Sequence, residues 1–196
     1  MLRLSILRKG KTMLANGKTP ASRYRASSIG FHWLMLLLFV AVYASVELRQ
    51  LFEKGSDPRE ALKTWHFMLG MLAFALAWLR LAARLSGPVP AIRPQPPRLQ
   101  QLSSRLLHLA LYVLMIGMPL TGWLVLSAAG KPIPFFGLEL PALIDENKAL
   151  AKQLKGLHEA VGTTGYVLIG GHVVAALYHH YIKRDDTLMR MLPERD

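Results

Sequence analysis

The segment HEAVGTTGYVLIGGH, residues 158–172, is the most informative part of the chain because two histidines enclose an apolar, glycine-rich interior. It overlaps a run without charged residues from Ala160 to Ile182. A bilayer core requires about 20 residues of helix, within a range of about 17–25, so this run is long enough to span a membrane. Fourteen residues complete nearly four helical turns, which places His158 and His172 on one face about 21 Å apart.

Three other runs have a similar length and character. Residues 29–46 and 106–130 contain no acidic residue, lysine or arginine. Another run lies between Lys63 and Arg80, and it reaches twenty residues if Arg80 extends along the helix toward the interface near Arg84. Four such runs predict an all-α fold, an integral membrane four-helix bundle with helices over about 28–49, 61–84, 102–128 and 155–183.

The composition agrees with a membrane location. Only 18% of the residues are charged and 52% are hydrophobic, with a mean hydropathy of +0.27, whereas soluble domains carry about 25% charged residues. The sequence contains no cysteine, which excludes disulfides, thiolate zinc sites and cysteine-ligated iron–sulfur clusters. We expect a basic cytoplasmic extension over residues 1–27, a transmembrane domain over 28–184 and a cytoplasmic tail over 185–196. Residues 86–98 form a proline-rich hinge between the second and third helices.

The net charge of +12 is of a size found in nucleic-acid-binding proteins, but the distribution of basic residues argues against that function. Residues 1–27, 80–105 and the C-terminal tail hold sixteen of the twenty-four lysines and arginines. The other eight lie in residues 47–63 and 131–155, together with seven acidic residues. The positive-inside rule therefore places both termini and the middle connection in the cytoplasm. The expected partner of these basic segments is the lipid bilayer and not nucleic acid.

The seven histidines fall in the predicted helices at two depths. His66 and His158 lie at the outer ends of the second and fourth helices. Five others lie in the inner half, and polar groups at such positions are costly and normally mark function. These inner residues are His32, His108, His172, His179 and His180.

Imidazoles from neighbouring helices, without thiolate or carboxylate partners, are typical of bis-histidine haem b. A zinc site would need three or four ligands in one place. A di-iron carboxylate site would need Glu-x-x-His pairs, which these helices lack. In the outer half His66 and His158 are the only candidates, so we predict that they form one pair.

The inner pair is less determined by the sequence. His172 can pair with His32 or His108, and His179 also lies on the required face. Iron atoms at the levels of His158 and His172 would be about 21 Å apart, whereas a ligand at His179 in place of His172 would give about 31 Å. Because the shorter separation suits electron transfer between macrocycles, we favour His32 with His172.

Small residues follow the predicted outer ligands. Gly162 and Gly165 occupy the histidine face of the fourth helix, and Gly70 follows His66 on the second. These positions would let a flat, bulky cofactor lie against the backbone, although glycines at such spacing also serve helix packing. Arg80 comes fourteen residues after His66, so it is a candidate to hold a haem propionate or to extend to the cytoplasmic interface.

Four segments carry a resemblance to a known family. They are IGFHWLMLLLFVAVYA (29–44), WHFMLGMLAFALAWLRLAARL (65–85), LSSRLLHLALYVLMIGMPLTGW (102–123) and LKGLHEAVGTTGYVLIGGHVVAALYHHYIKRDDTLMRMLP (154–193). Together they resemble the bacterial cytochrome b561 family of di-haem inner-membrane proteins, and within it the superoxide oxidases. The resemblance covers roughly residues 22–193 and leaves residues 1–21 unexplained.

The resemblance implies a multi-pass protein of the bacterial inner membrane that binds two haem b groups. By this likeness His32 and His172 ligate the inner haem, and His66 and His158 the outer one. The implied activity is a superoxide:ubiquinone oxidoreductase, which oxidises periplasmic superoxide to oxygen and reduces ubiquinone. Two alternatives stay open: an electron-transfer cytochrome b subunit of a membrane dehydrogenase or hydrogenase, and a histidine-based proton or metal transporter.

Two further sets of residues are candidates within this scheme. The histidines not used as ligands are candidates for binding the quinone, and they are His108, His179 and His180. Basic residues near the outer ends of the helices are candidates for steering the superoxide anion, and they are Arg49, Lys148, Lys152 and Lys155.

Overall fold

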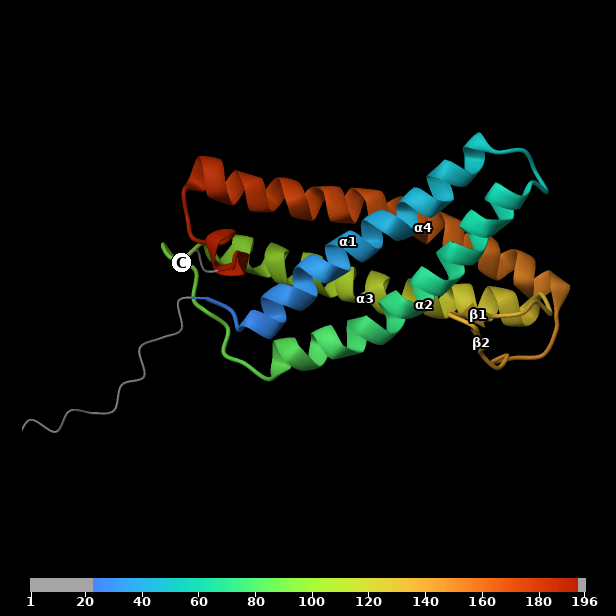
Figure 1. Ribbon diagram of the computed structural model, residues 1–196. Coiled ribbons are helices and arrows are strands. Elements are labelled where there is room, and N and C mark those ends of the chain that lie inside the picture. Colours follow the sequence, from blue (N-terminus) through green and yellow to red (C-terminus); the bar gives the residue numbers. More distant parts are fainter. Residues whose placement is uncertain (1–22, 194–196) are drawn as a thin grey trace, which may run out of the picture.

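The structure is a computed structural model that describes residues 23–193, so most of the predicted basic extension and the last three residues lie outside the described part. Four long helices run side by side along the molecule (Figure 1). In chain order the elements are α1 (Ala26–Leu48), the 3-10 turn η1 (Arg49–Leu51), α2 (Asp57–Leu85), α3 (Arg98–Ala128), β1 (Pro134–Phe135), β2 (Leu138–Glu139), α4 (Lys148–Tyr178), the π-helical turn η2 (His179–Lys183) and the 3-10 turn η3 (Met189–Met191).

All four helices are long and apolar enough to cross a membrane, which confirms the predicted all-α membrane bundle. Their outward faces carry large apolar side chains that no other part of the described chain covers. Leu37 is 67% exposed and Val167 is 74% exposed. Because a soluble protein rarely exposes such an extended apolar surface, the lipid bilayer is the environment of these faces.

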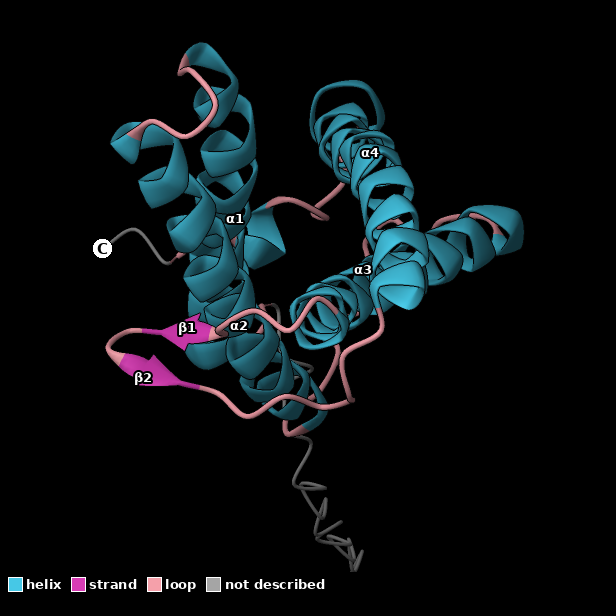
Figure 2. Ribbon diagram, turned by 90° about the vertical axis from the view of Figure 1, so that its right-hand side faces the viewer, coloured by secondary structure: helices cyan, strands magenta, loops and turns pink. Residues whose placement is uncertain are grey.

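The helices pack as two antiparallel pairs. Figure 2 shows α1 beside α2 and α3 beside α4, and α2 also packs on α3. The buried centre is formed by Met35 and Leu38 of α1, Ala73 and Ala77 of α2, and Met115 of α3. Alanine at the α2 positions allows the neighbouring backbones to approach closely. This arrangement sets the histidines of α1 and α2 opposite those of α4.

All four helices begin earlier than the sequence predicts, by two residues in α1, four in α2 and α3, and seven in α4. α4 begins at Lys148, seven residues before the expected start near 155, because the Asn147 side chain accepts a hydrogen bond from the Leu150 amide at 3.0 Å. Such an N-cap satisfies one of the free amides at a helix start. α2 begins at Asp57 with Pro58 in its first turn, a position where proline is favoured.

A short hairpin, β1–β2, lies between α3 and α4 at the outer end of the bundle. Its turn is built from Phe136 and Gly137, with φ of 49° and 87°. Both residues are left-handed, as the type I′ form of a two-residue hairpin turn requires. The Phe136 ring lies 6.3 Å from that of Trp65 on α2, so the hairpin packs on the outer end of that helix.

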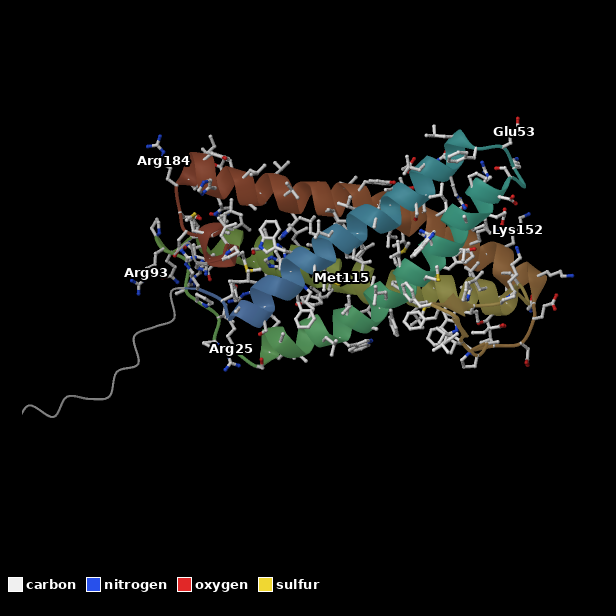
Figure 3. All side chains as sticks on the ribbon, viewed as in Figure 1. Arg25, Glu53, Arg93, Met115, Lys152 and Arg184 are labelled. Carbon is white, nitrogen blue, oxygen red and sulfur yellow. The ribbon has the colours of Figure 1, made fainter. Side chains whose placement is uncertain are left out.

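Both ends of the described chain meet the 86–97 connection at the opposite, inner end. The Trp33 indole donates to the Met191 carbonyl at 2.8 Å, and the Arg93 amide donates to an Asp186 carboxylate oxygen at 3.0 Å. Figure 3 labels Arg93 and Arg184 together at this end. The structure therefore groups at one end the segments that the charge distribution assigns to the cytoplasm.

Candidate functional site

The outer end of the bundle contains one pair of facing imidazoles. His66 of α2 and His158 of α4 have ring centroids 6.2 Å apart, with the ring planes at 86°. The Nδ1 atom of His66 lies 3.3 Å from the Val42 carbonyl and 3.4 Å from the Ser45 hydroxyl, both on α1. An Nδ1–H that donates to a carbonyl fixes the tautomer and leaves Nε2 free as a ligand.

His158 is accommodated by a glycine on the neighbouring helix. A Cβ atom added to Gly122 of α3 would lie 3.3 Å from Cε1 of His158 and 3.7 Å from its Nδ1. The first separation is tight, so a side chain larger than alanine at this position would displace the imidazole. Gly122 therefore positions His158, a role that the sequence alone did not indicate.

In the inner half three histidines lie together instead of an isolated pair. His172 of α4 lies 6.1 Å from His32 of α1 and 5.4 Å from His108 of α3, measured between ring centroids. The His108 Nδ1 is also 3.4 Å from the hydroxyl of Ser104, one turn earlier on α3. Both partners that the sequence allowed for His172 are thus brought beside it.

The spacing of the rings favours a two-ligand site in each half. Two imidazole nitrogens bonded to one metal from opposite sides, at about 2 Å each, hold their ring centroids about 6 Å apart. The His66–His158 and His32–His172 separations of 6.2 and 6.1 Å fit this value, whereas 5.4 Å for His108–His172 is shorter.

A bare metal ion is a poor fit for these positions. Within residues 23–193, no group of three or more His, Cys, Asp or Glu side chains is arranged to hold a metal ion. A haem needs only two protein ligands because its macrocycle supplies the other four. The residues present therefore fit haem b at two levels, about 21 Å apart along α4 by the rise of the helix.

Arg80 of α2 lies beside the inner histidines. Its Nε and Nη1 atoms are buried and have no hydrogen-bond partner among the described residues. Its guanidinium carbon is 5.9 Å from the centre of the Tyr112 ring, and its charge acts on the His32 imidazole. Two buried guanidinium donors without a partner are costly, so an anionic group is expected next to them. A haem propionate fits this requirement better than extension of Arg80 to the interface.

The glycines predicted to face a cofactor divide into two groups. A Cβ atom at Gly70 would meet no heavy atom within 4 Å, so the α2 surface there is open. A Cβ atom at Gly165 would instead collide with the hydroxyl of Tyr43, which donates to the Gly162 carbonyl at 3.0 Å. At Gly162 an added Cβ would touch the Met118 methyl at 3.4 Å. In this structure Gly162 and Gly165 therefore lie against side chains from α3 and α1, and their contact with a flat cofactor stays a prediction.

The lysines predicted to steer superoxide lie at the outer start of α4, where Figure 3 labels Lys152. Lys155 forms an ion pair with Glu159 at 2.7 Å, and Lys148 lies 3.5 Å from a carboxylate oxygen of Glu146. All of these side chains are exposed, and exposed ion pairs contribute little. Glu146 and Glu159 also offset part of the positive charge of the lysines that were predicted to attract superoxide.

Arg49 is the predicted steering residue that the structure brings close to a histidine pair. It begins η1, directly after α1. Its Nε atom is buried and has no hydrogen-bond partner within the described part of the chain. Its charge acts on the His66 imidazole. Its position and its unsatisfied donor therefore keep Arg49 a candidate for attracting a small anion toward the outer pair.

His179 lies at the inner end, at the start of the π-helical turn η2. Its Nδ1 atom contacts the Asp185 carboxylate, and its Nε2 atom is 2.7 Å from the amide nitrogen of Gln100 on α3. Burial raises the pKa of Asp185, but hydrogen bonds from Thr187 and His179 outweigh it and lower the pKa below its usual value. The carboxylate is therefore ionised near neutral pH.

The other quinone candidates are placed differently. His180 lies against Tyr181, with ring centroids 4.8 Å apart, at the end of α4. His108 joins the inner histidine group, and a serine at position 104 and a tyrosine at position 112 flank it on the same helix face. The four-residue repeat of these polar side chains on α3 is a signal that is also visible in the sequence.

Comparison with known proteins gives a consistent result. Residues 23–194 match the model of the family described as prokaryotic cytochrome b561. The chain is 34% identical over 174 residues to cytochrome b561 homolog 1 of Escherichia coli (strain K12), an alignment that covers 89% of this chain and 99% of the relative.

Two further relatives have similar coverage. A Yersinia pestis protein named probable superoxide oxidase CybB is 35% identical over 173 residues, which is 88% of this chain and 97% of that protein. Cytochrome b561 homolog 2 of Escherichia coli (strain K12) is 32% identical over 175 residues, or 89% and 93% of the two chains.

Proposed function

Because the chain belongs to the prokaryotic cytochrome b561 family, we propose that it moves electrons across the bilayer through two b-type haems. The family consists of bacterial membrane oxidoreductases that bind b-type haem and transfer electrons. The proposed ligands are His66 and His158 for the outer haem and His32 and His172 for the inner haem. The observation that carries this proposal is the pair of imidazole separations, 6.2 and 6.1 Å, at two levels of α4.

The proposed reaction is the oxidation of two superoxide anions to oxygen, coupled to the reduction of one ubiquinone. Each superoxide loses one electron, and the two electrons with two protons convert ubiquinone to ubiquinol. A relative named probable superoxide oxidase, 35% identical to this chain, supports this choice of substrate. The bound haems supply the one-electron chemistry, and the inner membrane is the proposed location.

The protein's own residues orient and attract the reacting groups. The Val42 carbonyl and the Ser45 hydroxyl hold the His66 ring, which fixes the direction of its Nε2 atom. Arg49 places a positive charge near His66 at the outer end, where it raises the local concentration of a small anion. Arg80 offers two buried donors to a propionate at the inner level.

Haem stoichiometry in purified protein tests the ligand assignment. We expect about two b-type haems per chain in detergent, and the variants His66→Ala and His32→Ala should each lose one. His108→Ala is the matched control, because the proposed ligand sets do not use that imidazole. Loss of haem from His108→Ala with retention in His32→Ala would reassign the inner ligand. A protein that binds no haem would remove the electron-transfer proposal and restore the transporter alternative.

Superoxide-driven quinone reduction tests the reaction itself. Protein supplied with enzymatically generated superoxide and a soluble ubiquinone analogue should form quinol, and superoxide dismutase should abolish that signal. A dehydrogenase or hydrogenase subunit would instead retain both haems, show no reaction with superoxide and purify with a soluble partner. That combination of results would overturn the proposed substrate and leave the haem assignment intact.

A further inference from the structure

One face of α3 carries a line of polar side chains in an otherwise apolar helix. Gln100, Ser104, His108 and Tyr112 recur every four residues, so they lie on one side of the helix. The Ser104 hydroxyl is 3.4 Å from the His108 Nδ1. Polar groups at this depth are costly and normally serve a function. This polar stripe, residues 100, 104, 108 and 112, runs from the inner end of the bundle toward the inner histidine group.

The stripe begins at a buried carboxylate–imidazole pair. His179 contacts Asp185 through Nδ1 and lies 2.7 Å from the Gln100 amide nitrogen through Nε2. The side chains of His179 and Asp185 are only 14% and 5% exposed. The chain returns to make this contact through Arg184, whose φ of 53° is left-handed, and the Thr187 amide donates to Asp185 at 2.9 Å.

The backbone in this segment is specialised. A π-helical turn, such as that over residues 179–183, is rare and is frequently found at functional sites. A left-handed conformation at an arginine is strained and persists only where the surroundings hold it. Several local features therefore combine to keep one carboxylate against one imidazole.

The partners of His179 can serve both of its protonation states. When the ring is neutral, Nδ1–H donates to Asp185 and the bare Nε2 accepts from the Gln100 amide. When the ring is protonated, Nε2–H needs an acceptor, and rotation of the same amide presents its oxygen. A glutamine at this position therefore permits proton gain and loss without leaving a buried donor or acceptor unpaired.

Given the proposed reduction of ubiquinone, we propose that His179, held by Asp185, takes up protons at the inner end and passes them through Gln100 and Ser104 toward the quinone. Each four-residue interval on α3 rises about 6 Å, which one water molecule is able to bridge. The two electrons come from two superoxide anions, and the two carbonyl oxygens of ubiquinone each gain one of these protons. No other oxidant or reductant is needed.

The basic side chains near the His179–Asp185 pair, Arg190 and Lys183, make their contacts with other residues. The Arg190 side chain pairs with Asp186 at 3.3 Å and also donates to the Pro90 carbonyl. The Lys183 ammonium lies 5.9 Å from the centre of the Tyr178 ring. Asp185 is therefore the ionised group in direct contact with His179 among the described residues.

The test uses haem-loaded protein in vesicles with a pH indicator in either compartment, and protease cleavage of the tail reports its orientation. We expect proton uptake from the compartment that contains the C-terminal tail. His179→Gln should slow quinone reduction by about 100-fold, the scale of lost general acid–base catalysis, and Asp185→Asn and Ser104→Leu should act in the same direction. Reduction of the haems by superoxide and the haem content should not change.

Ser103→Leu is the matched control for Ser104→Leu. Its hydroxyl bonds to the Leu99 carbonyl at 2.9 Å on the exposed face of α3, so proton uptake and rate should equal those of the wild type. The inference is overturned if the His179 and Ser104 variants take up protons and reduce quinone at the wild-type rate. It is also overturned if the protons come from the other compartment.

A separate measurement distinguishes this failure from failure of the proposed function. The haems are reduced with dithionite, and their reoxidation by the quinone analogue is followed by stopped-flow absorbance in light and heavy water. If the haems of the wild-type protein are reoxidised by the quinone analogue but are not reduced by superoxide, superoxide is not the electron donor. The proton path is still tested in that case, because dithionite supplies the electrons. The rate of reoxidation should show a solvent isotope effect that His179→Gln alters, and equal isotope effects in the two proteins would contradict the path.

Discussion

Replacement of Gly165 with alanine is expected to destabilise the bundle, because the added Cβ atom would collide with the Tyr43 hydroxyl. Tyr43 has little freedom to withdraw, since its hydroxyl donates to the Gly162 carbonyl at 3.0 Å and its ring lies 4.4 Å from that of Tyr166. Overpacking costs about 1–3 kcal/mol, and the displaced hydrogen bond adds about 1 kcal/mol. Removal of a glycine from a helix returns about 1 kcal/mol. The net loss should be about 1–3 kcal/mol.

The apparent midpoint of thermal unfolding in detergent, followed by tryptophan fluorescence at one scan rate, measures this change. A loss of 1 kcal/mol lowers the midpoint by about 2–4 °C for a chain of this size. Gly170→Ala is the control on the same helix, since its Cβ atom would meet nothing within 4 Å. Tyr43→Phe should reduce the penalty of Gly165→Ala, because it removes the clashing oxygen. A Gly165→Ala protein that melts at or above the wild-type temperature would refute the reasoning.

Three further changes have defined outcomes. Gly122→Leu should displace the His158 ring and halve the haem content, as measured by pyridine haemochrome absorbance, because even a Cβ atom there lies 3.3 Å from Cε1. Arg80→Met should lower the midpoint potential of one haem in a redox titration, since it removes a buried positive charge. Burial raises the pKa of Asp185, but hydrogen bonds from Thr187 and His179 outweigh burial, so the pKa lies below its usual value. The carboxylate therefore stabilises the fold above the usual carboxyl pKa, and this stabilisation is lost as the pH falls through the lowered pKa. Protease resistance of the C-terminal tail should therefore fall in acid for the wild type, and Asp185→Asn should lack this dependence.

The features predictable from the sequence are those set by local chemistry and helical period. Charged groups are excluded from a bilayer core, so uncharged runs of sufficient length identify the four spans. The fourteen-residue interval between His158 and His172 fixes two levels on one face, whatever the neighbouring helices do. His66 was predicted as the outer partner because the outer half holds no third histidine.

The features that escaped prediction depend on how one helix faces another. Whether Gly165 meets a cofactor or the Tyr43 side chain depends on the lateral position of α1 against α4, which helical period does not determine. The start of α4 depends on a cap at Asn147. The contact between His179 and Asp185 depends on a left-handed arginine at position 184, a conformation that the residue type disfavours.

The two proposed ligand pairs share an architectural property. Each takes one imidazole from the α1–α2 pair of helices and one from α4, so both span the seam between the two helix pairs. A rigid group ligated on both sides of this seam would join the helix pairs, and the free energy of its binding would add to the stability of the bundle. Packing at Gly165 and ligation at His172 then act on the same seam, about two turns apart on α4. The bundle therefore couples its stability to the separation at which the imidazoles are held, and the same contacts that hold α1 against α4 preserve the spacing needed for ligation.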